Sequence, residues 1–600
     1  MTPTSEQQKI LNCPDKYIAI NALAGTGKTT TLCLYTINNP NEKMLYLCYN
    51  KSIAMEAKKV FPKNVDVMTF HSLAYRSIGF KYAEKLKGNL SISDIIKILS
   101  LEKSKRTALL GQSIYDTLNN YCASQDQLIS SKHVNRKYLE SSNTLRNKTE
   151  EEVEVILTKI ANLTAKLWNH ITDVNTSTAI THDTYLKLFS LNAPVLSKYS
   201  CILIDEAQDL TPCFINFIEA QKSKLIIVGD KYQSINQWRG SFNYIENNKG
   251  KFTEFYLTQS FRFNQSIADL ANCALTYLQA DRKIEAIKKN NNSSLTTNIL
   301  STTGKKHVGG INILSWKNQE QNKTKTYAII ARHNFSIYDK TLELIEKREN
   351  FFVEGNLDLK ELMEVQHLNN FKITGKTSHH VYEGYNSFGE IEKLIHEGIL
   401  TDSDIIKRYN IISRWGSKTS SNIAKLQQFC KENQFKKITP ETLILTTVHK
   451  SKGKEYDCVE LLDDFTCHID MANPENRKFF LDEKGQNNIK QIEYKGQKKA
   501  CVASFTCIED NRWQEEMNIF YVALTRSKEK LFLPKFYHSL LNNLVLLGEQ
   551  GLNEQLNKTL FDQGVNFTHQ LVSLFEREKL RNQLSINSEE FERVKKVVKL

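Results

Sequence analysis

Short apolar runs recur along the first half of the chain, and several are followed by a segment with apolar residues at helical spacing. A run that is apolar at nearly every position is typical of a parallel strand buried on both faces. Four of these runs are KYIAI, KMLYLCYN, CILIDEAQD and KLIIVGD. Helical segments such as SIAMEAKKVF and TPCFINFIEAQ follow two of them. Repeated strand–helix units predict a doubly wound parallel sheet with its ligand at the carboxyl ends of the strands.

A long helical pattern interrupts this series and predicts an inserted helical segment. Its best helix begins with a capping box formed by Thr149 and Glu152. Apolar residues then recur on one face, at Val153, Ile156, Ile160, Leu163 and Leu167. A stripe of this kind is more typical of core packing than of a binding face.

Composition narrows the class of protein only slightly. With 600 residues the chain is long enough for about four domain-sized units. A net charge of +13 favours a polyanionic partner weakly. The 12 cysteines include no CxxC pair, and no apolar run is long enough to span a bilayer. We therefore expect a soluble intracellular protein without a membrane partner, cytoplasmic if bacterial and nuclear if eukaryotic.

The stretch NALAGTGKTT, residues 21–30, is typical of a phosphate-binding loop between a strand and a helix. Its backbone N–H groups and the helix N-terminus can hold phosphates. Lys28 would reach the β- and γ-phosphates, and the Thr29 hydroxyl would hold Mg²⁺. The other nucleotide contacts expected from this loop are Ala22, Ala24, Gly25, Thr26, Gly27 and Thr30.

Two acidic residues end the strand CILI and complete the expected site. Asp205 is placed to hold the Mg²⁺ shell, and Glu206 to polarise the attacking water. A surface acidic pair after a core strand is the alternative interpretation. The upstream phosphate loop and the second strand-to-acid turn of KLIIVGD argue against that alternative.

Further motifs, taken in order, resemble those of the superfamily 1 helicases of the UvrD/Rep type. They begin with TSEQQ, YNKSIAMEA, TFHSLAYR, DEAQD and VGDKYQSINQWRGS. They continue with YLTQSFRF, LTTVHKSKGKEYD and EEMNIFYVALTRSKEKL. THDTYLKL, YNKSIAMEA and FYLTQSFRF resemble more specifically the helicase region of the F-box DNA helicases and their bacterial or viral relatives. Because the chain begins almost at the first motif, an F-box and its ubiquitin-ligase role are not expected.

The resemblance implies an α/β fold with two RecA-like P-loop NTPase cores, each a parallel doubly wound sheet with a mostly helical inserted subdomain. The first core would comprise residues 1–76 and 181–250, with a helical insertion at 77–180. The second would comprise 251–334 and 441–540, with an insertion at 335–440. Residues 541–600 would form a helical C-terminal tail. The lysine-rich stretch at about 466–512 is expected to be a loop or hairpin.

The resemblance also implies roles for individual residues. Gln7 would read adenine, Glu455 would contact the ribose, and Gln233 would face the γ-phosphate. Phe261 would stack on adenine, with a buried strand-end aromatic as the alternative. Arg262 and Arg526 suit an arginine-finger role at the γ-phosphate. The expected DNA contacts are Asn50, Lys51, Thr69, Phe70, His71, Trp238, Arg239 and His449.

These features predict an ATP- and Mg²⁺-dependent DNA translocase and helicase acting in repair or recombination. Its partners would be single-stranded and partial-duplex DNA, and the 3′→5′ polarity comes from the resemblance alone. One alternative is a remodeller that strips recombinase filaments from DNA. Another is the motor subunit of an ATP-dependent nuclease. Two departures from the family pattern are Asn236, where Tyr is frequent, and Lys454, where Leu is usual.

Overall fold

Two six-stranded sheets, both parallel, form the framework of the protein in the computed structural model. The structure describes residues 2–533 apart from 89, 103–104, 137–138, 140–147, 236–243, 249, 279, 288–298, 302–324, 378, 380, 383–384, 397–402, 437, 440–441, 466–488, 495–496 and 503–510. The chain divides into two units. The first contains Met1–Leu23 and Gly27–Leu257; the second contains Ala24–Thr26 and Thr258–Leu600.

The sheet of the first unit has the strand order β3-β2-β4-β5-β1-β6. Its strands are β1 (Tyr17–Ala22), β2 (Met44–Cys48), β3 (Val65–Thr69), β4 (Cys201–Ile204), β5 (Lys224–Gly229) and β6 (Thr253–Leu257). Every residue of β2 and β4 is buried, as expected for central parallel strands. Non-consecutive neighbours in this order mean that the chain crosses over, which is the doubly wound arrangement predicted from the sequence.

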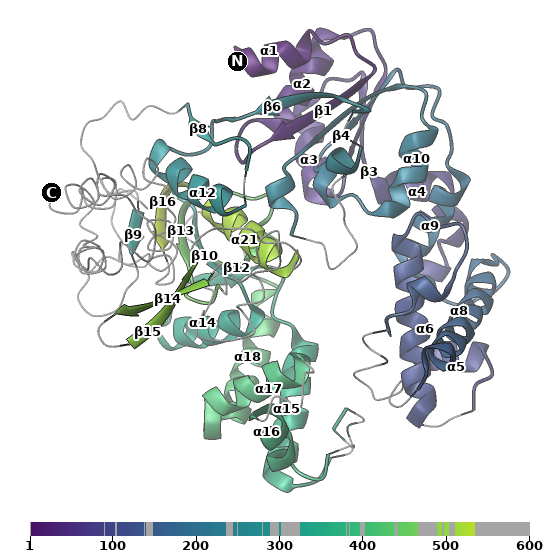
Figure 1. Ribbon diagram of the computed structural model, residues 1–600, viewed down its shortest axis with the longest axis vertical. Helices are drawn as coiled ribbons and strands as arrows, with labels where there is room; N and C mark the ends of the chain where they lie inside the picture. Colours follow the sequence, from purple (N-terminus) through teal and green to yellow (C-terminus); the bar gives the residue numbers. More distant parts are fainter. Residues whose placement is uncertain are drawn as a thin grey trace. The chain divides into compact units, whose positions relative to one another are not determined.

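Helices cover both faces of this sheet (Figure 1). Alternate residues of β2 point to opposite faces. Met44, Tyr46 and Cys48 join a core cluster that includes residues of α1 (Ser5–Leu11), α2 (Lys28–Asn38) and α3 (Lys51–Val60). Leu45 and Leu47 join the cluster on the other face, with α4 (Phe70–Ser77), α9 (His182–Asn192) and α10 (Ile215–Ala220). A short α11 (Tyr244–Asn247) precedes β6.

The predicted helical insertion is present in the first unit. Its described α-helices are α5 (Ile92–Ile98), α6 (Lys105–Ala123) and α8 (Glu150–Thr172), and α6 packs against both of the others and against α9. Thr149 and Glu152 form the predicted capping box at the start of α8. Val153, Ile160 and Leu167 are buried in the core, which confirms that this stripe serves packing.

The sheet of the second unit has the order β11-β12-β10-β13-β16-β9. Its strands are β9 (Ile299–Ser301), β10 (Tyr327–Ala331), β11 (Phe351–Val353), β12 (Leu443–Thr447), β13 (Tyr456–Leu461) and β16 (Ser527–Leu533). The unit also contains the short pair β7 (Gln259–Ser260) and β8 (Glu285–Ala286), together with α12 (Gln265–Tyr277), α14 (Asn334–Glu346), α19 (Val448–Ser451) and α21 (Asn511–Leu524). The predicted α/β fold with two parallel-sheet cores is thus confirmed.

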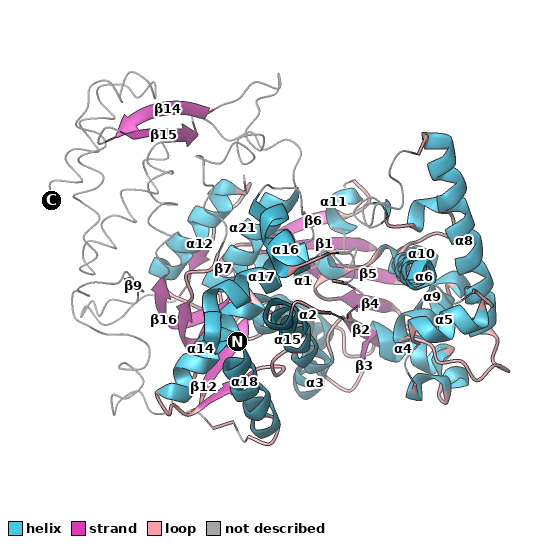
Figure 2. Ribbon diagram, turned by 90° about the horizontal axis from the view of Figure 1, so that it is seen from below, coloured by secondary structure: helices cyan, strands magenta, loops and turns pink. Residues whose placement is uncertain are grey.

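Four helices of the second unit follow β11 and precede β12, and Figure 2 draws them in cyan. They are α15 (Leu359–Thr374), α16 (Phe388–His396), α17 (Ser403–Trp415) and α18 (Thr419–Asn433). Within the lysine-rich stretch, β14 (Ile489–Tyr494) and β15 (Gln497–Val502) pair as an antiparallel hairpin. The expected tail at 541–600 lies outside the described residues. Among the described helices, none is both long and apolar enough to cross a membrane.

Candidate functional site

The carboxyl ends of five strands of the first sheet carry most of the residues singled out from the sequence. The phosphate loop follows β1, Asn50 follows β2, and Thr69 to His71 lie at the end of β3. Asp205 and Glu206 follow β4, and Asp230 follows β5. Since parallel strands end at the same edge of a sheet, segments far apart in sequence share one edge in this fold.

The phosphate loop leads directly into α2, whose first residue is Lys28. Gly27 caps this helix with φ 80°, in the left-handed region that glycine adopts without steric cost. The preceding segment, Ala24–Thr26, groups with the second unit. There Gly25 has φ 74°, and a Cβ on it would lie 2.7 Å from the Arg262 Cβ. Only glycine therefore fits at this point of the loop.

Lys28 and Thr29 meet the two acidic residues that end β4. Lys28 Nζ lies 3.1 Å from Glu206 Oε1, and both side chains are mostly shielded from solvent. The Thr29 hydroxyl donates a 2.8 Å hydrogen bond to Asp205 Oδ2. The structure therefore brings together all four residues that the sequence predicted for phosphate, metal and water.

A tyrosine that the sequence analysis did not single out completes the shell of Asp205. The Tyr46 hydroxyl, fully buried in β2, donates a 2.7 Å hydrogen bond to Asp205 Oδ2. The Glu206 N–H donates to the other oxygen at 2.8 Å. A tyrosine within an apolar strand was the available signal, because a buried phenol requires a hydrogen-bond partner.

The charge balance of this site favours an additional cation. Burial would lower the pKa of Lys28, but the carboxylates of Glu206, Asp230 and Asp205 outweigh it and leave that pKa raised. Burial and the neighbouring Glu206 raise the pKa of Asp205. Burial also raises the pKa of Asp230, to about 6. Among the described residues, one ammonium group thus faces three buried or half-buried carboxylates. Thr29 and Asp205 fit Mg²⁺, whose preferred ligands are oxygens.

Two more side chains, Gln208 and Gln233, belong to the same site. Glu206 has a left-handed backbone, with φ 57°, and Gln208 Nε2 donates a hydrogen bond to its Oε2. Gln208 Oε1 accepts the Asp230 N–H at 2.9 Å. Gln233, expected near the γ-phosphate, is buried and donates from Nε2 to Asp230 Oδ2 at 2.7 Å. The sequence analysis did not assign Gln208 or Asp230, although both lie inside motifs it used.

The two residues expected to contact adenine lie in different units. In the first unit, Gln7 is 2% exposed and completes the capping box of α1 with Thr4. Its Nε2 donates to Thr31 Oγ1 at 3.0 Å, which ties α1 to the helix that follows the phosphate loop. In the second unit, Phe261 is half-buried, and its N–H donates to Gly25 O at 2.9 Å.

Both candidate arginine fingers lie in the second unit. Arg262 donates from Nε to Glu455 Oε2 at 2.9 Å and from Nη1 to Thr525 O at 3.0 Å. Glu455, expected at the ribose, is therefore the ion-pair partner of Arg262 in this structure. Arg526 is 1% exposed and donates to the carbonyls of Val522 and Lys454.

The expected DNA contacts of the first unit gather at the ends of β2 and β3. Asn50 caps α3 and Thr69 caps α4, while Lys51 is exposed. His71 is partly exposed, and its Nε2 lies 3.3 Å from Asp183 Oδ1. Phe70 requires a correction: it is 1% exposed and packs on Phe214, with ring centroids 4.1 Å apart, so it offers no face to a base.

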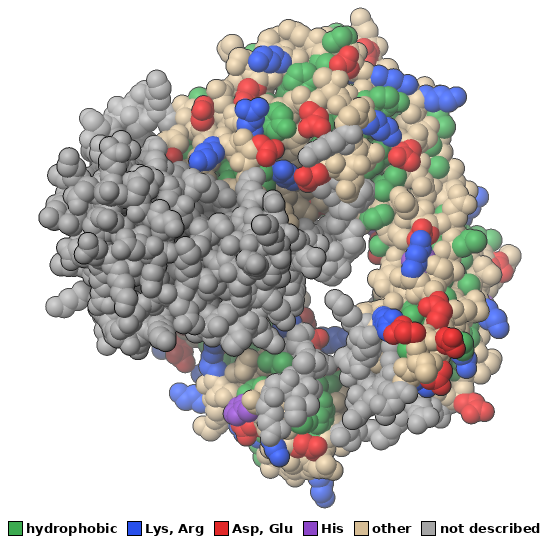
Figure 3. Space-filling view, in the orientation of Figure 1, with side chains coloured by type: hydrophobic (Ala, Val, Ile, Leu, Met, Phe, Trp, Pro, Cys, Tyr) green, Lys and Arg blue, Asp and Glu red, His purple; other side chains and the backbone are tan. Residues whose placement is uncertain are grey.

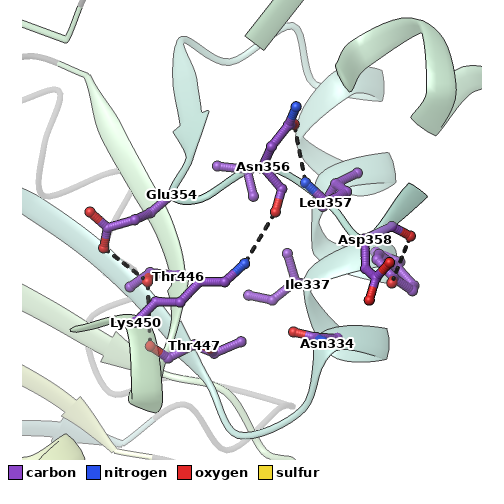
Figure 4. A pocket seen from close by; sticks show the side chains of 11 residues that line it. Asn334, Ile337, Glu354, Asn356, Leu357, Asp358, Thr446, Thr447 and Lys450 are labelled. Carbon is purple, nitrogen blue, oxygen red and sulfur yellow. Dashed lines mark hydrogen bonds between the residues drawn. The ribbon is translucent and has the colours of Figure 1, made fainter. Parts of the chain in front are cut away.

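His449 lies on α19 in the second unit, next in sequence to Lys450, which lines the pocket drawn in Figure 4. In this pocket Lys450 reaches across and donates to Asn356 O at 3.1 Å. Thr446 Oγ1 donates to Glu354 Oε2 at 3.1 Å. Glu354 and Asp358 also line this pocket, so its polar lining combines carboxylates with the Lys450 ammonium group.

Trp238 and Arg239, also expected at DNA, lie outside the described residues. On the face shown in Figure 3, Lys and Arg side chains of the described part are interspersed with Asp and Glu rather than gathered in one patch. On that face, the positive net charge therefore does little to indicate where a nucleic acid would bind.

Comparison with known proteins identifies the family. The UvrD/REP helicase N-terminal domain matches residues 3–253, and the UvrD-like helicase C-terminal domain matches residues 385–538. The chain is 29% identical to "F-box DNA helicase protein 1" of Schizosaccharomyces pombe and 27% identical to "F-box DNA helicase 1" of Gallus gallus. These alignments cover 88% and 92% of the chain, and 57% and 51% of the relatives.

A "Probable DNA helicase II homolog" of Mycoplasma genitalium is 24% identical, over 88% of the chain and 84% of that relative. The chain spans about half the length of the two F-box relatives. Apart from YLTQSFRF at residues 256–263, the motifs of the series lie within the two matched domains. The chain belongs to the UvrD/Rep helicase family.

Proposed function

We propose that the chain is an ATP-dependent DNA translocase and helicase that moves 3′→5′ along a single strand and separates the duplex ahead of it. The observation that carries this proposal is the contact of Lys28 with Glu206, 3.1 Å apart, beside the bond from Thr29 to Asp205. One edge of the sheet then carries the three groups that ATP hydrolysis needs. They are the Lys28 ammonium group for the phosphates, the Thr29 and Asp205 oxygens for Mg²⁺, and the Glu206 carboxylate for the attacking water.

Each residue of this edge has a distinct task in the proposed reaction. Bound Mg²⁺–ATP supplies the phosphoanhydride bond whose hydrolysis drives movement. Lys28 binds the phosphate oxygens, and Thr29 and Asp205 hold the metal. Glu206 orients a water molecule and accepts its proton as the water attacks. The arginines of the second unit, Arg262 and Arg526, supply positive charge for the phosphoryl group in transfer.

Strand displacement on partial duplexes tests this function directly. The substrates carry a 3′ or a 5′ single-stranded tail, with DNA and RNA in parallel. We expect ATP-dependent separation of the 3′-tailed DNA alone, and no separation by Lys28→Ala, which loses the cation facing the phosphates. Equal activity on both tails would reject the polarity. Absence of DNA-stimulated ATP hydrolysis in the wild type would reject the motor itself.

A second use of the same motor is the removal of recombinase filaments from DNA. The similarity to F-box DNA helicases extends over about nine-tenths of the chain and favours this second function. Unwinding and stripping need the same ATP site, so a filament-disruption assay beside strand displacement separates them. If the protein removes recombinase filaments but does not separate the strands of a protein-free duplex, filament removal would replace the helicase proposal.

A further inference from the structure

Gln208 occupies a central position in the site, although none of the roles assigned above belongs to it. Its side chain is 1% exposed and lies between the ends of β4 and β5. Nε2 donates to Glu206 Oε2, and Oε1 accepts the Asp230 N–H at 2.9 Å. One planar amide therefore joins the proposed base to the segment that follows β5.

The space for this amide exists because residue 229 is glycine. A Cβ on Gly229, the last residue of β5, would lie 2.7 Å from Gln208 Oε1. Real Cβ atoms essentially never come so close to another heavy atom. Alanine at 229 would therefore displace the amide oxygen at the end of the Gln208 side chain. Gly229 therefore leaves room for the Gln208 amide because it has no side chain.

The two oxygens of Glu206 are held by different groups. Lys28 Nζ lies 3.1 Å from Oε1, whereas Gln208 holds Oε2. In the proposed reaction Lys28 binds phosphate oxygens, so its hold on Glu206 weakens when nucleotide is present. Gln208 then remains one of the side chains that keep this carboxylate in place.

The connection continues beyond Gln208 to the residue expected at the γ-phosphate. Asp230 is 1% exposed, and its Oδ2 accepts a 2.7 Å hydrogen bond from Gln233 Nε2. Ser234 Oγ lies 3.4 Å from Gln208 O, a second link between the two segments. Gln208 thus connects Glu206 with a segment that leads, in sequence, toward Trp238 and the expected DNA contacts.

We propose that Gln208 is a positioning residue that fixes the Glu206 carboxylate relative to the 230–234 segment, so that DNA engagement at that segment aligns the base. This inference rests on the proposed function. Misplacing a reacting group by about 1 Å can cost about 10²-fold in rate. An amide suits the position because its oxygen accepts from the Asp230 N–H while its nitrogen donates to Glu206. Methionine has a similar size, but it has no donor and its sulfur accepts only weakly.

The test compares Gln208→Met with the wild type in three measurements: affinity for a fluorescent, non-hydrolysable ATP analogue, basal ATP turnover, and turnover at saturating single-stranded DNA. We expect wild-type analogue affinity and a DNA-stimulated kcat lower by about tenfold to 10²-fold. Basal turnover falls less, so the ratio of stimulated to basal rate shrinks. A residue that only supports the fold would not change this ratio selectively.

Gly229→Ala provides an independent variant, because it displaces the amide while leaving Gln208 in the chain. It should reproduce the kinetic defect. Combined with Gln208→Ala it should have a smaller effect than in the wild type, because the clashing oxygen is gone and only the 3.2 Å approach to the residue 208 N and the 3.3 Å approach to the Ala207 Cβ remain. Gln221→Met is the matched control. Gln221 is also a buried glutamine of the first unit, with its amide bonded to Leu196, Pro194 and Phe217. It should lower stability without changing the ratio.

Three results would overturn the proposal. One is a wild-type stimulated kcat in folded Gln208→Met. Another is an equal loss of basal and stimulated turnover in Gln208→Met and Gln221→Met, which would mean a purely structural role. The third is loss of analogue binding together with turnover. If the wild type itself shows no DNA-stimulated hydrolysis, the proposed function fails first, and the positioning role fails with it.

Discussion

The ammonium group of Lys28 interacts with the carboxylates of Glu206, Asp205 and Asp230 at the centre of the first unit. At the scale of individual residues, this shared charge explains why the site fits both a metal ion and phosphates. A metal cation can neutralise the excess negative charge of these carboxylates. The phosphate groups of a nucleotide can then replace the carboxylates as partners of the Lys28 ammonium group. The proposed division of labour assigns binding to Lys28 and proton transfer to Glu206.

Glu206→Gln separates these two tasks. The amide is nearly isosteric and cannot accept a proton, so we expect nucleotide binding to persist while DNA-stimulated ATP turnover falls by about 10²- to 10⁴-fold. Analogue binding and steady-state hydrolysis measure the two effects. Glu219→Gln on α10, a half-exposed carboxylate, is the control and should behave as wild type. Loss of nucleotide binding in Glu206→Gln would make Glu206 a binding residue instead.

Lys51→Ala tests the expected DNA contacts. Lys51 is exposed at the first position of α3, next to Asn50 at the sheet edge. Removing one phosphate contact should weaken binding to all single-stranded sequences and reduce the slope of log K against log salt by about 0.7. Fluorescence anisotropy across a salt series measures both quantities. Lys58→Ala, in the last turn of the same helix, is the matched control. An unchanged slope for Lys51→Ala would show that Lys51 makes no contact with a DNA phosphate.

At the scale of secondary structure, some of the predictions depended on local patterns and others on distant residues meeting. The strands, the phosphate loop and the cap of α8 are local, and the structure confirms them. The bond from Tyr46 to Asp205 depends on β2 and β4 lying side by side, which no local pattern specifies. The link from Gln208 to Asp230 similarly requires β4 beside β5.

Phe70 was misplaced for a local reason. It belongs with Leu73 and Ala74 to the buried stripe of α4, at the spacing of one helical face. Reading the motif as a set of binding residues therefore overlooked its helical periodicity. His71, next in sequence, lies off that stripe and is partly exposed.

Thr149→Ala tests the helical insertion. The Thr149 hydroxyl oxygen accepts the Glu152 N–H at 3.3 Å, and Glu152 Oε2 accepts the Thr149 N–H at 2.9 Å. Losing this cap should cost about 0.5–2 kcal/mol of stability. Thr149→Ser keeps the hydroxyl and should be close to wild type. Denaturant unfolding monitored by circular dichroism measures both variants, and equal stability of the two would show that α8 needs no cap.

At the scale of the whole molecule, the two units contain separate hydrophobic cores. Leu203 of β4 lies in a cluster of the first unit, and Leu445 of β12 lies in the cluster of the second. Both side chains are fully buried. Each sheet therefore has its own source of stability, and the described clusters give no reason to expect a single cooperative transition.

Leu203→Ala and Leu445→Ala form a matched pair for this expectation. Each deletes a buried leucine side chain, which typically costs about 2–5 kcal/mol. Differential scanning calorimetry of the full chain should resolve two transitions, and each substitution should shift a different one. If both substitutions lowered one shared transition equally, the units would unfold as a single body.

The left-handed backbone of Glu206 also has an evolutionary consequence. A residue with a full side chain at φ 57° is strained by about 1–2 kcal/mol, and asparagine or glycine would relieve that strain. Selection for stability alone would therefore favour replacing this glutamate, whereas its proposed role as the base in hydrolysis would favour keeping it. Among diverging descendants of this gene, Asn or Gly at this position would mark lineages that have abandoned hydrolysis.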